Sequence, residues 1–151
     1  MYIDIKSITK YILIPLILGA LAGFLSGSFG GYKDMVMPSF APPGILFPIV
    51  WSILYILMGV SRYIISQKDN NSSAVSIYRF QLGVNLLWSF FFFTFRWYLF
   101  SFLWIILLII LVLIMIKKFY NISKVASFLQ IPYLVWIVFA SILNFSIYYL
   151  N

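Results

Sequence analysis

Five long apolar stretches, separated by short polar segments, make up most of this 151-residue sequence. They lie at about residues 9–27, 43–66, 76–95, 98–117 and 123–150. A helix needs roughly 20 apolar residues to cross the hydrocarbon core of a bilayer. The fourth stretch, FLWIILLIILVLIMI, is continuously apolar and lacks the alternation that is typical of membrane barrel strands. The pattern therefore predicts an all-α membrane protein, a five-transmembrane-helix bundle that forms one domain over 1–151.

The composition supports this interpretation. Hydrophobic residues make up 64% of the chain and charged residues 9%, with a mean hydropathy of +1.07. A soluble domain this short could not bury so much apolar surface. The first stretch also resembles a secretory signal peptide, because Lys6 and Lys10 precede it and Ala20-Leu21-Ala22 lies within it. We expect it to be retained as a span.

The distribution of positive charge predicts the orientation in the membrane. Ten Lys and Arg residues are present, and in the five-helix topology all but Lys33 and Arg96 fall on the same side. These are Lys6, Lys10, Arg62, Lys68, Arg79, Lys117, Lys118 and Lys124. Positively charged loops stay in the cytoplasm. We therefore expect an integral protein, of the plasma or inner membrane, with its N-terminus in the cytoplasm and its C-terminus outside.

The stretch MPSFAPPGILF, residues 37–47, contains Pro38, Pro42 and Pro43 ahead of the second span. Proline lacks an amide donor and has a fixed φ, so this segment cannot form a regular helix but suits the start of one. In the predicted topology residues 28–42 form an outer loop, a rigid entrance to the apolar region.

The residue types exclude several functions. The chain has no histidine and no cysteine, so a zinc site, a thiolate nucleophile and an imidazole base are ruled out. The three carboxylates, Asp4, Asp34 and Asp69, lie outside the spans, which disfavours ion-coupled transport. No glycine-rich phosphate loop is present. The positive charges are scattered and form no stripe, so we expect no nucleic-acid partner and no metal site.

The spans carry aromatic and amide side chains at helical spacing, in three stripes. The stripes are Trp51 and Tyr55; Asn85, Trp88, Ser89 and Phe92; and Tyr133, Trp136, Ala140 and Asn144. An unpaired amide is costly in hydrocarbon, so these residues should face protein or ligand. They could line a cavity for a flat apolar ligand. Alternatively, the rings are interfacial belt residues and the amides only join helices.

Three segments have a distinctive combination of residues: PSFAPPGILFPIVWSILYILMG at 38–59, LGVNLLWSFFFF at 82–93 and IPYLVWIVFASILNFSIYYLN at 131–151. Together they resemble the TspO family, also known as translocator or tryptophan-rich sensory proteins. The likeness covers nearly the whole chain. Met37 stands where the family usually has a basic residue, and Gly31 and Phe40 stand where it often has tryptophan.

The resemblance implies a five-helix bundle, usually a homodimer, with a pocket that binds porphyrins or other planar apolar ligands under a lid formed by residues 28–42. By motif position the pocket would be lined by Tyr32, Pro42, Trp51, Tyr55, Asn85, Ser89, Phe92, Trp136 and Ala140. Asn85, Ser89 and Tyr32 would offer hydrogen bonds to the ligand. No cofactor is required, since the porphyrin is a ligand.

The resemblance leaves three functions open. The first is a binding or sensing protein with an outward-opening aromatic pocket. The second is an enzyme that degrades porphyrin in light and oxygen, with Trp51 and Trp136 as its catalytic pair. The third is a transporter of porphyrins or other lipophilic molecules. An axial histidine or cysteine for haem iron is absent, so we expect metal-free porphyrin to be preferred.

Gly19, Gly23 and Gly27 lie four residues apart in the first span. Small residues at this spacing allow another backbone to approach closely. The ridge could pack within the bundle or form the seam of a dimer.

Overall fold

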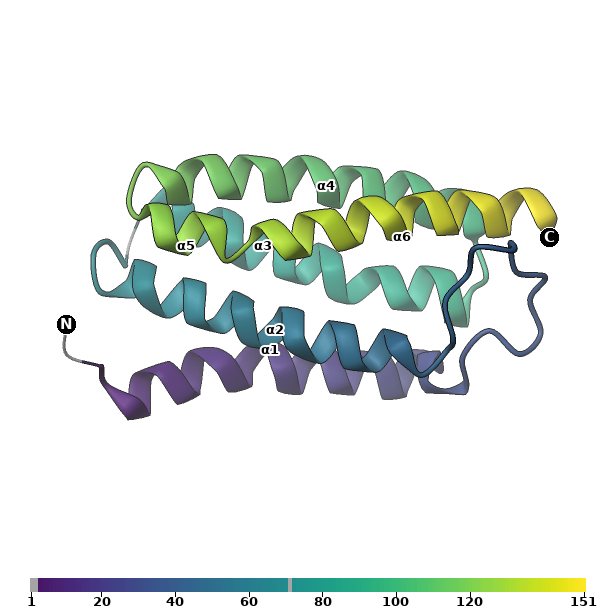
Figure 1. Cartoon of the computed structure of the whole chain (residues 1–151), viewed down its shortest axis with the longest axis horizontal. Coiled ribbons are helices and arrows are strands. Elements are labelled where there is room, and N and C mark those ends of the chain that lie inside the picture. The colour runs from purple at the N-terminus through teal and green to yellow at the C-terminus, as the bar shows by residue number, and fades with distance from the viewer. Residues whose placement is uncertain (1–2, 71) are drawn as a thin grey trace.

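The computed structural model describes residues 3–70 and 72–151, and over these residues it is helical, with no strand (Figure 1). The long helices are α1 (Ile5–Ser26), α2 (Leu46–Ser66), α3 (Ser73–Ser89), α4 (Tyr98–Tyr120) and α6 (Ile131–Leu150). Shorter elements are the 3₁₀ turn η1 (Ser28–Gly30), the π-helix η2 (Phe90–Thr94) and α5 (Lys124–Phe128). By length and composition four helical segments can cross a membrane, namely α1, α2, α4 and Lys124–Leu150. Together α3 and η2 form the fifth long segment.

Two helix boundaries follow from local chemistry. α1 begins before the expected residue 9 because the Asp4 side chain accepts hydrogen bonds from Lys6 N at 3.1 Å and from Ser7 Oγ at 2.8 Å, which caps the helix. The last span, expected over 123–150, is divided into α5 and α6. The division lies next to Pro132, which has no amide hydrogen to continue the ladder of hydrogen bonds.

The third long segment ends in a widened turn. The amide of Phe95 donates to Phe90 O at 3.0 Å, and that of Trp97 donates to Phe91 O at 2.9 Å. Arg96, between them, has a φ of 55°, a strained conformation for a side chain other than glycine. This corner turns the chain from η2 into α4, and π-helical turns of this kind are frequent at functional sites.

The helices surround a common interior. α1 packs on α2 and α3, α4 packs on α3, α5 and α6, and α2 reaches α5. α1 and α2 approach closely at Gly59, where an added Cβ would collide with the backbone of Tyr11 and Ile12. Large apolar side chains such as Leu21, Ile53 and Leu103 cover the outside, each more than half exposed. An apolar exterior over helices of this length is that of an integral membrane protein.

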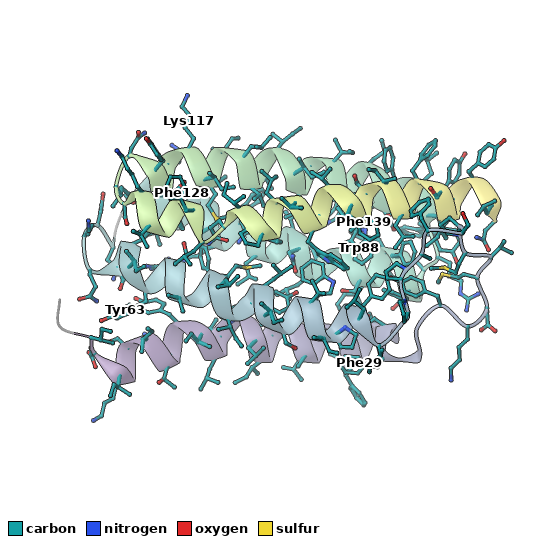
Figure 2. All side chains as sticks on the ribbon, in the orientation of Figure 1. Phe29, Tyr63, Trp88, Lys117, Phe128 and Phe139 are labelled. Carbon is teal, nitrogen blue, oxygen red and sulfur yellow. The ribbon has the colours of Figure 1, made fainter. Side chains whose placement is uncertain are left out.

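The two ends of the bundle differ. One end, called the lid end here, carries the loop of residues 27–45 (the lid loop), the Phe95–Trp97 corner and Asn151 (Figure 1). At this end lie Lys33 and Arg96. The other eight Lys and Arg residues belong to the opposite end or to the helix turns nearest it, as the helix directions require. Lys117 projects away from the bundle there (Figure 2).

Candidate functional site

A cavity of about 430 Å³ opens toward the lid end of the bundle. Its wall comes from α1, the lid loop, α2, α3 with η2, and α6. It is lined by Gly19, Gly23, Ser28, Phe29, Gly30, Gly31, Tyr32, Lys33, Gly44, Ile45, Phe47, Pro48, Trp51, Tyr55, Asn85, Trp88, Ser89, Phe92, Phe93, Trp136, Ala140, Leu143, Asn144 and Ile147. This volume is in the range of small-molecule sites.

The structure brings eight of the nine sequence-predicted residues together around this cavity. They are Tyr32, Trp51, Tyr55, Asn85, Ser89, Phe92, Trp136 and Ala140. Pro42 is not among the lining residues. As contacts of a ligand, all nine remain predictions.

Indoles from α2 and α6 lie among the side chains that line the cavity. Trp51 of α2 lies beside Tyr55, with ring centroids 5.5 Å apart. Trp136 of α6 lies between Phe47 and Phe139, at centroid distances of 5.7 and 5.4 Å. Both indoles line the cavity, so they offer apolar ring surface to whatever enters it.

A chain of buried hydrogen bonds closes the cavity toward the opposite end. The Tyr55 hydroxyl donates to Asn85 Oδ1 at 2.7 Å, and Asn85 Nδ2 donates to Tyr133 Oη at 2.8 Å. The Tyr133 hydroxyl in turn donates to Gln81 Oε1 at 2.8 Å. These bonds join α2, α3 and α6. The oxygen and the nitrogen of the Asn85 side-chain amide are therefore both engaged within the protein, and Asn85 forms part of the floor of the cavity.

Asn144 forms a second polar junction on the wall. Its Oδ1 accepts from Trp88 Nε1 at 3.0 Å, and its Nδ2 donates to the carbonyl of Tyr98 at 2.8 Å. Figure 2 shows Trp88 between the helices. Trp88 and Asn144 were absent from the predicted site, although their helical spacing had placed them on the same stripes. The hydroxyl of Ser89 is likewise used locally, since it donates to Leu86 O at 3.3 Å.

The Tyr32 ring reaches from the lid loop into a group of phenylalanines. Its centroid lies 4.8 Å from that of Phe47, 5.5 Å from Phe93 and 6.2 Å from Phe92. Burial raises the pKa of the Tyr32 hydroxyl above its usual range, so the side chain stays neutral at physiological pH. The ring attaches the loop to α2 and η2 and narrows the entrance of the cavity.

Polar contacts hold the lid loop on both sides of the entrance. Asn151 Nδ2 donates to Val36 O at 3.0 Å, and Asn151 Oδ1 accepts from Val36 N at 3.1 Å. Asp34 forms an ion pair with Arg96 at 3.5 Å. Because both ion-pair side chains are more than half exposed, that pair contributes little to stability. The paired bonds of Asn151 are the more specific tether.

Replacing Asn151 by alanine is expected to loosen the lid loop. The change removes both hydrogen bonds to Val36, each worth about 1 kcal/mol. Hydrogen exchange at the Val36 amide should then rise by roughly tenfold, as measured by mass spectrometry in detergent. Ser146→Ala is the matched control, because the Ser146 hydroxyl bonds only its own helix, at Ile142 O. Equal exchange in both variants would contradict the tether.

Comparison with known proteins decides the family. The family model described as TspO/MBR family matches residues 11–150. The chain belongs to the TspO/MBR family. It is 41% identical over 148 residues to the tryptophan-rich protein TspO of Archaeoglobus fulgidus, covering 92% of this chain and 96% of that protein. It is 40% identical over 124 residues to the tryptophan-rich protein TspO of Chlorobaculum tepidum, covering 80% and 78%. The translocator protein of Sus scrofa is 28% identical over 149 residues, covering 91% and 86%.

Tryptophan is concentrated at the cavity in this member of the TspO/MBR family. Of five tryptophans in the chain, Trp51, Trp88 and Trp136 line the cavity. The described residues contain no cluster of acidic, histidine or cysteine side chains that could hold a metal ion. The lining offers aromatic ring surface together with polar side chains.

The glycine ridge of α1 is used inside the bundle. Gly19 leaves room for the Tyr55 ring, and Gly23 lies beside Phe29 and Ser28. Both glycines line the cavity. Gly27 ends α1 with a φ of 85°, and its amide donates to the carbonyls of Gly23 and Phe24, as in a glycine C-cap. Gly19 and Gly23 therefore pack within the bundle, and a dimer seam along this ridge stays a prediction.

Proposed function

We propose that this protein is a membrane-embedded binding or sensing protein for a porphyrin or another planar apolar ligand. The observation that carries the proposal is the convergence of Trp51, Trp88 and Trp136 on one cavity. Flat ring systems gain dispersion and burial against such walls. Membership of the TspO/MBR family supports the same ligand class, because the resemblance to that family implies a pocket for porphyrins or other planar apolar ligands.

We propose further that all five long segments span the membrane, with α3 and η2 together forming the third span. The end carrying the eight Lys and Arg residues then faces the cytoplasm, by the positive-inside rule. The cavity opens to the outer side, beneath the lid loop. A homodimer stays a prediction from the family resemblance.

The closed floor favours retention of the ligand over its passage. The Tyr55–Asn85–Tyr133–Gln81 chain lies between the cavity and the opposite end, and all four side chains are buried. A molecule crossing the bundle would have to separate these hydrogen bonds. Breaking a buried hydrogen bond leaves polar groups unpaired, at a cost of about 1–3 kcal/mol for each group. A binding protein needs no such opening.

Titration of the purified protein with metal-free protoporphyrin in detergent tests the proposal. We expect saturable quenching of tryptophan fluorescence at about one porphyrin per chain, because three of the five tryptophans line the cavity. Empty micelles with free tryptophan provide the control for non-specific quenching. Quenching that rises linearly without saturation would contradict a defined site.

The presence of both Trp51 and Trp136 in the cavity wall also favours a second candidate function, the oxidation of bound porphyrin by molecular oxygen in light. In such a reaction the photoexcited ring loses electrons, molecular oxygen accepts them, and the two indoles beside the ring would relay them. The two functions are separated by illuminating the complex under air and measuring the loss of the porphyrin absorption bands over time. Loss of many porphyrin equivalents per protein indicates an enzyme. Bleaching that stops near one equivalent indicates a binding protein.

A further inference from the structure

Lys33 is the one formally charged side chain among the residues that line the cavity. It follows Tyr32 directly in the lid loop, and its side chain is exposed at the entrance. The rest of the lining is aromatic, aliphatic or neutral polar. A ligand in the cavity would therefore meet apolar rings along its body and one ammonium group at its outer edge.

Among the residues that the structure describes, no acidic side chain forms an ion pair with Lys33. The chain has three acidic side chains, Asp4, Asp34 and Asp69. Asp4 precedes α1 and Asp69 follows α2, so both belong to the opposite end of the bundle. Asp34 is the acid at the lid end, and it pairs with Arg96 at 3.5 Å. The positive charge of Lys33 is thus left uncompensated beside the cavity.

Most polar groups deeper in the wall already form hydrogen bonds within the protein, whereas the buried Nε1 of Trp136 has no hydrogen-bond partner. The amides of Asn85 and Asn144 each donate and accept within the protein. The hydroxyls of Ser28 and Ser89 donate to backbone carbonyls at 3.0 and 3.3 Å. The strongest polar recognition that remains is at the entrance, since a hydrogen bond from an ammonium group is stronger than one between neutral partners.

We propose that Lys33 recognises an acidic group on the edge of the planar ligand, so that the site selects anionic amphiphilic rings over the same rings with a neutral edge. The inference rests on the proposed binding function and adds the charge and orientation of the ligand. The apolar body enters between the indoles. The acid stays at the entrance beside Lys33, where water and the ammonium group both solvate it.

The test compares protoporphyrin, which carries two carboxylic acids, with its dimethyl ester at low ionic strength and neutral pH. We expect the wild type to bind the acid about fivefold more tightly than the ester, which corresponds to the free energy of a favourable, partly exposed ion pair. Lys33→Gln should abolish this preference without weakening the binding of the ester. Lys33→Arg should retain the preference for the acid. Added salt should weaken the binding of the acid but not that of the ester. Lys117→Gln is the matched control, because Lys117 is exposed near the opposite end.

Each outcome of the comparison has a distinct meaning. An acid preference that persists in Lys33→Gln, or equal binding of acid and ester by the wild type, overturns the role of Lys33 while the binding function stands. If the wild type binds neither the acid nor the ester saturably, the proposed function is overturned, and this inference with it.

Discussion

Replacing Gly59 by alanine is expected to destabilise the protein by about 2 kcal/mol, the middle of the range for overpacking a close contact. An added Cβ would collide with the Ile12 Cα and the Tyr11 carbonyl oxygen of α1. These are backbone atoms, which cannot rotate away as a side chain can, so α1 and α2 must separate. The free energy of unfolding, measured by titration with SDS from mixed micelles, provides the check.

Gly83→Ala is the control for that change. Gly83 also lies inside a helix, but nothing stands within 4 Å of the position of an added Cβ. There the substitution should raise the free energy of unfolding by about 0.5–1 kcal/mol, since alanine favours a helix more than glycine does. The two variants carry the same chemical change with opposite expected signs. Stabilisation by both would show that α1 and α2 do not pack closely at Gly59.

The double substitution Trp51→Ala with Trp136→Ala is expected to weaken porphyrin binding by about 100-fold, the combined effect of two aromatic anchors in a desolvated site. Each indole contributes ring surface to the cavity from a different helix. Removing both leaves the ligand without stacking partners on two sides. The dissociation constant is followed by the porphyrin absorption bands, because tryptophan fluorescence changes with the substitutions.

Trp97→Ala is the control for loss of an indole. Trp97 lies at the lid end but is 52% exposed and does not line the cavity, so affinity should change by less than about twofold. An unchanged affinity in the double variant would mean that porphyrin binds elsewhere, and the proposed site would be wrong.

The helical stripes could be predicted from the sequence. Residues spaced three or four apart on a helix must share a face, so the spacing alone placed Asn85, Ser89 and Phe92 together, and Trp136 with Ala140. The apolar exterior could also be predicted, because the five apolar stretches are too long and too apolar to be buried in the core of a soluble protein of this size. These features depend on geometry within one helix or on composition.

The use of each polar side chain was not predictable in the same way. Asn85 and Ser89 were expected to offer hydrogen bonds to a ligand, but the structure engages Asn85 with Tyr55 and Tyr133, and Ser89 with its own helix. The hydrogen-bond partners of a side-chain amide depend on how the neighbouring helices are rotated about their axes and shifted along them. The spacing within one helix carries no information about either.

The sequence by itself determined the membrane class, the helical stripes and the excess of positive charge on one side, because each follows from local periodicity or composition. Only the tertiary structure decided that the stripes meet at one cavity, that Asn151 holds the lid loop and that Lys33 lies at the entrance, where no acidic side chain of the described residues pairs with it. These arrangements join residues far apart in the chain, such as Val36 and Asn151. They depend on how whole helices pack, which is set by shape complementarity summed over many contacts.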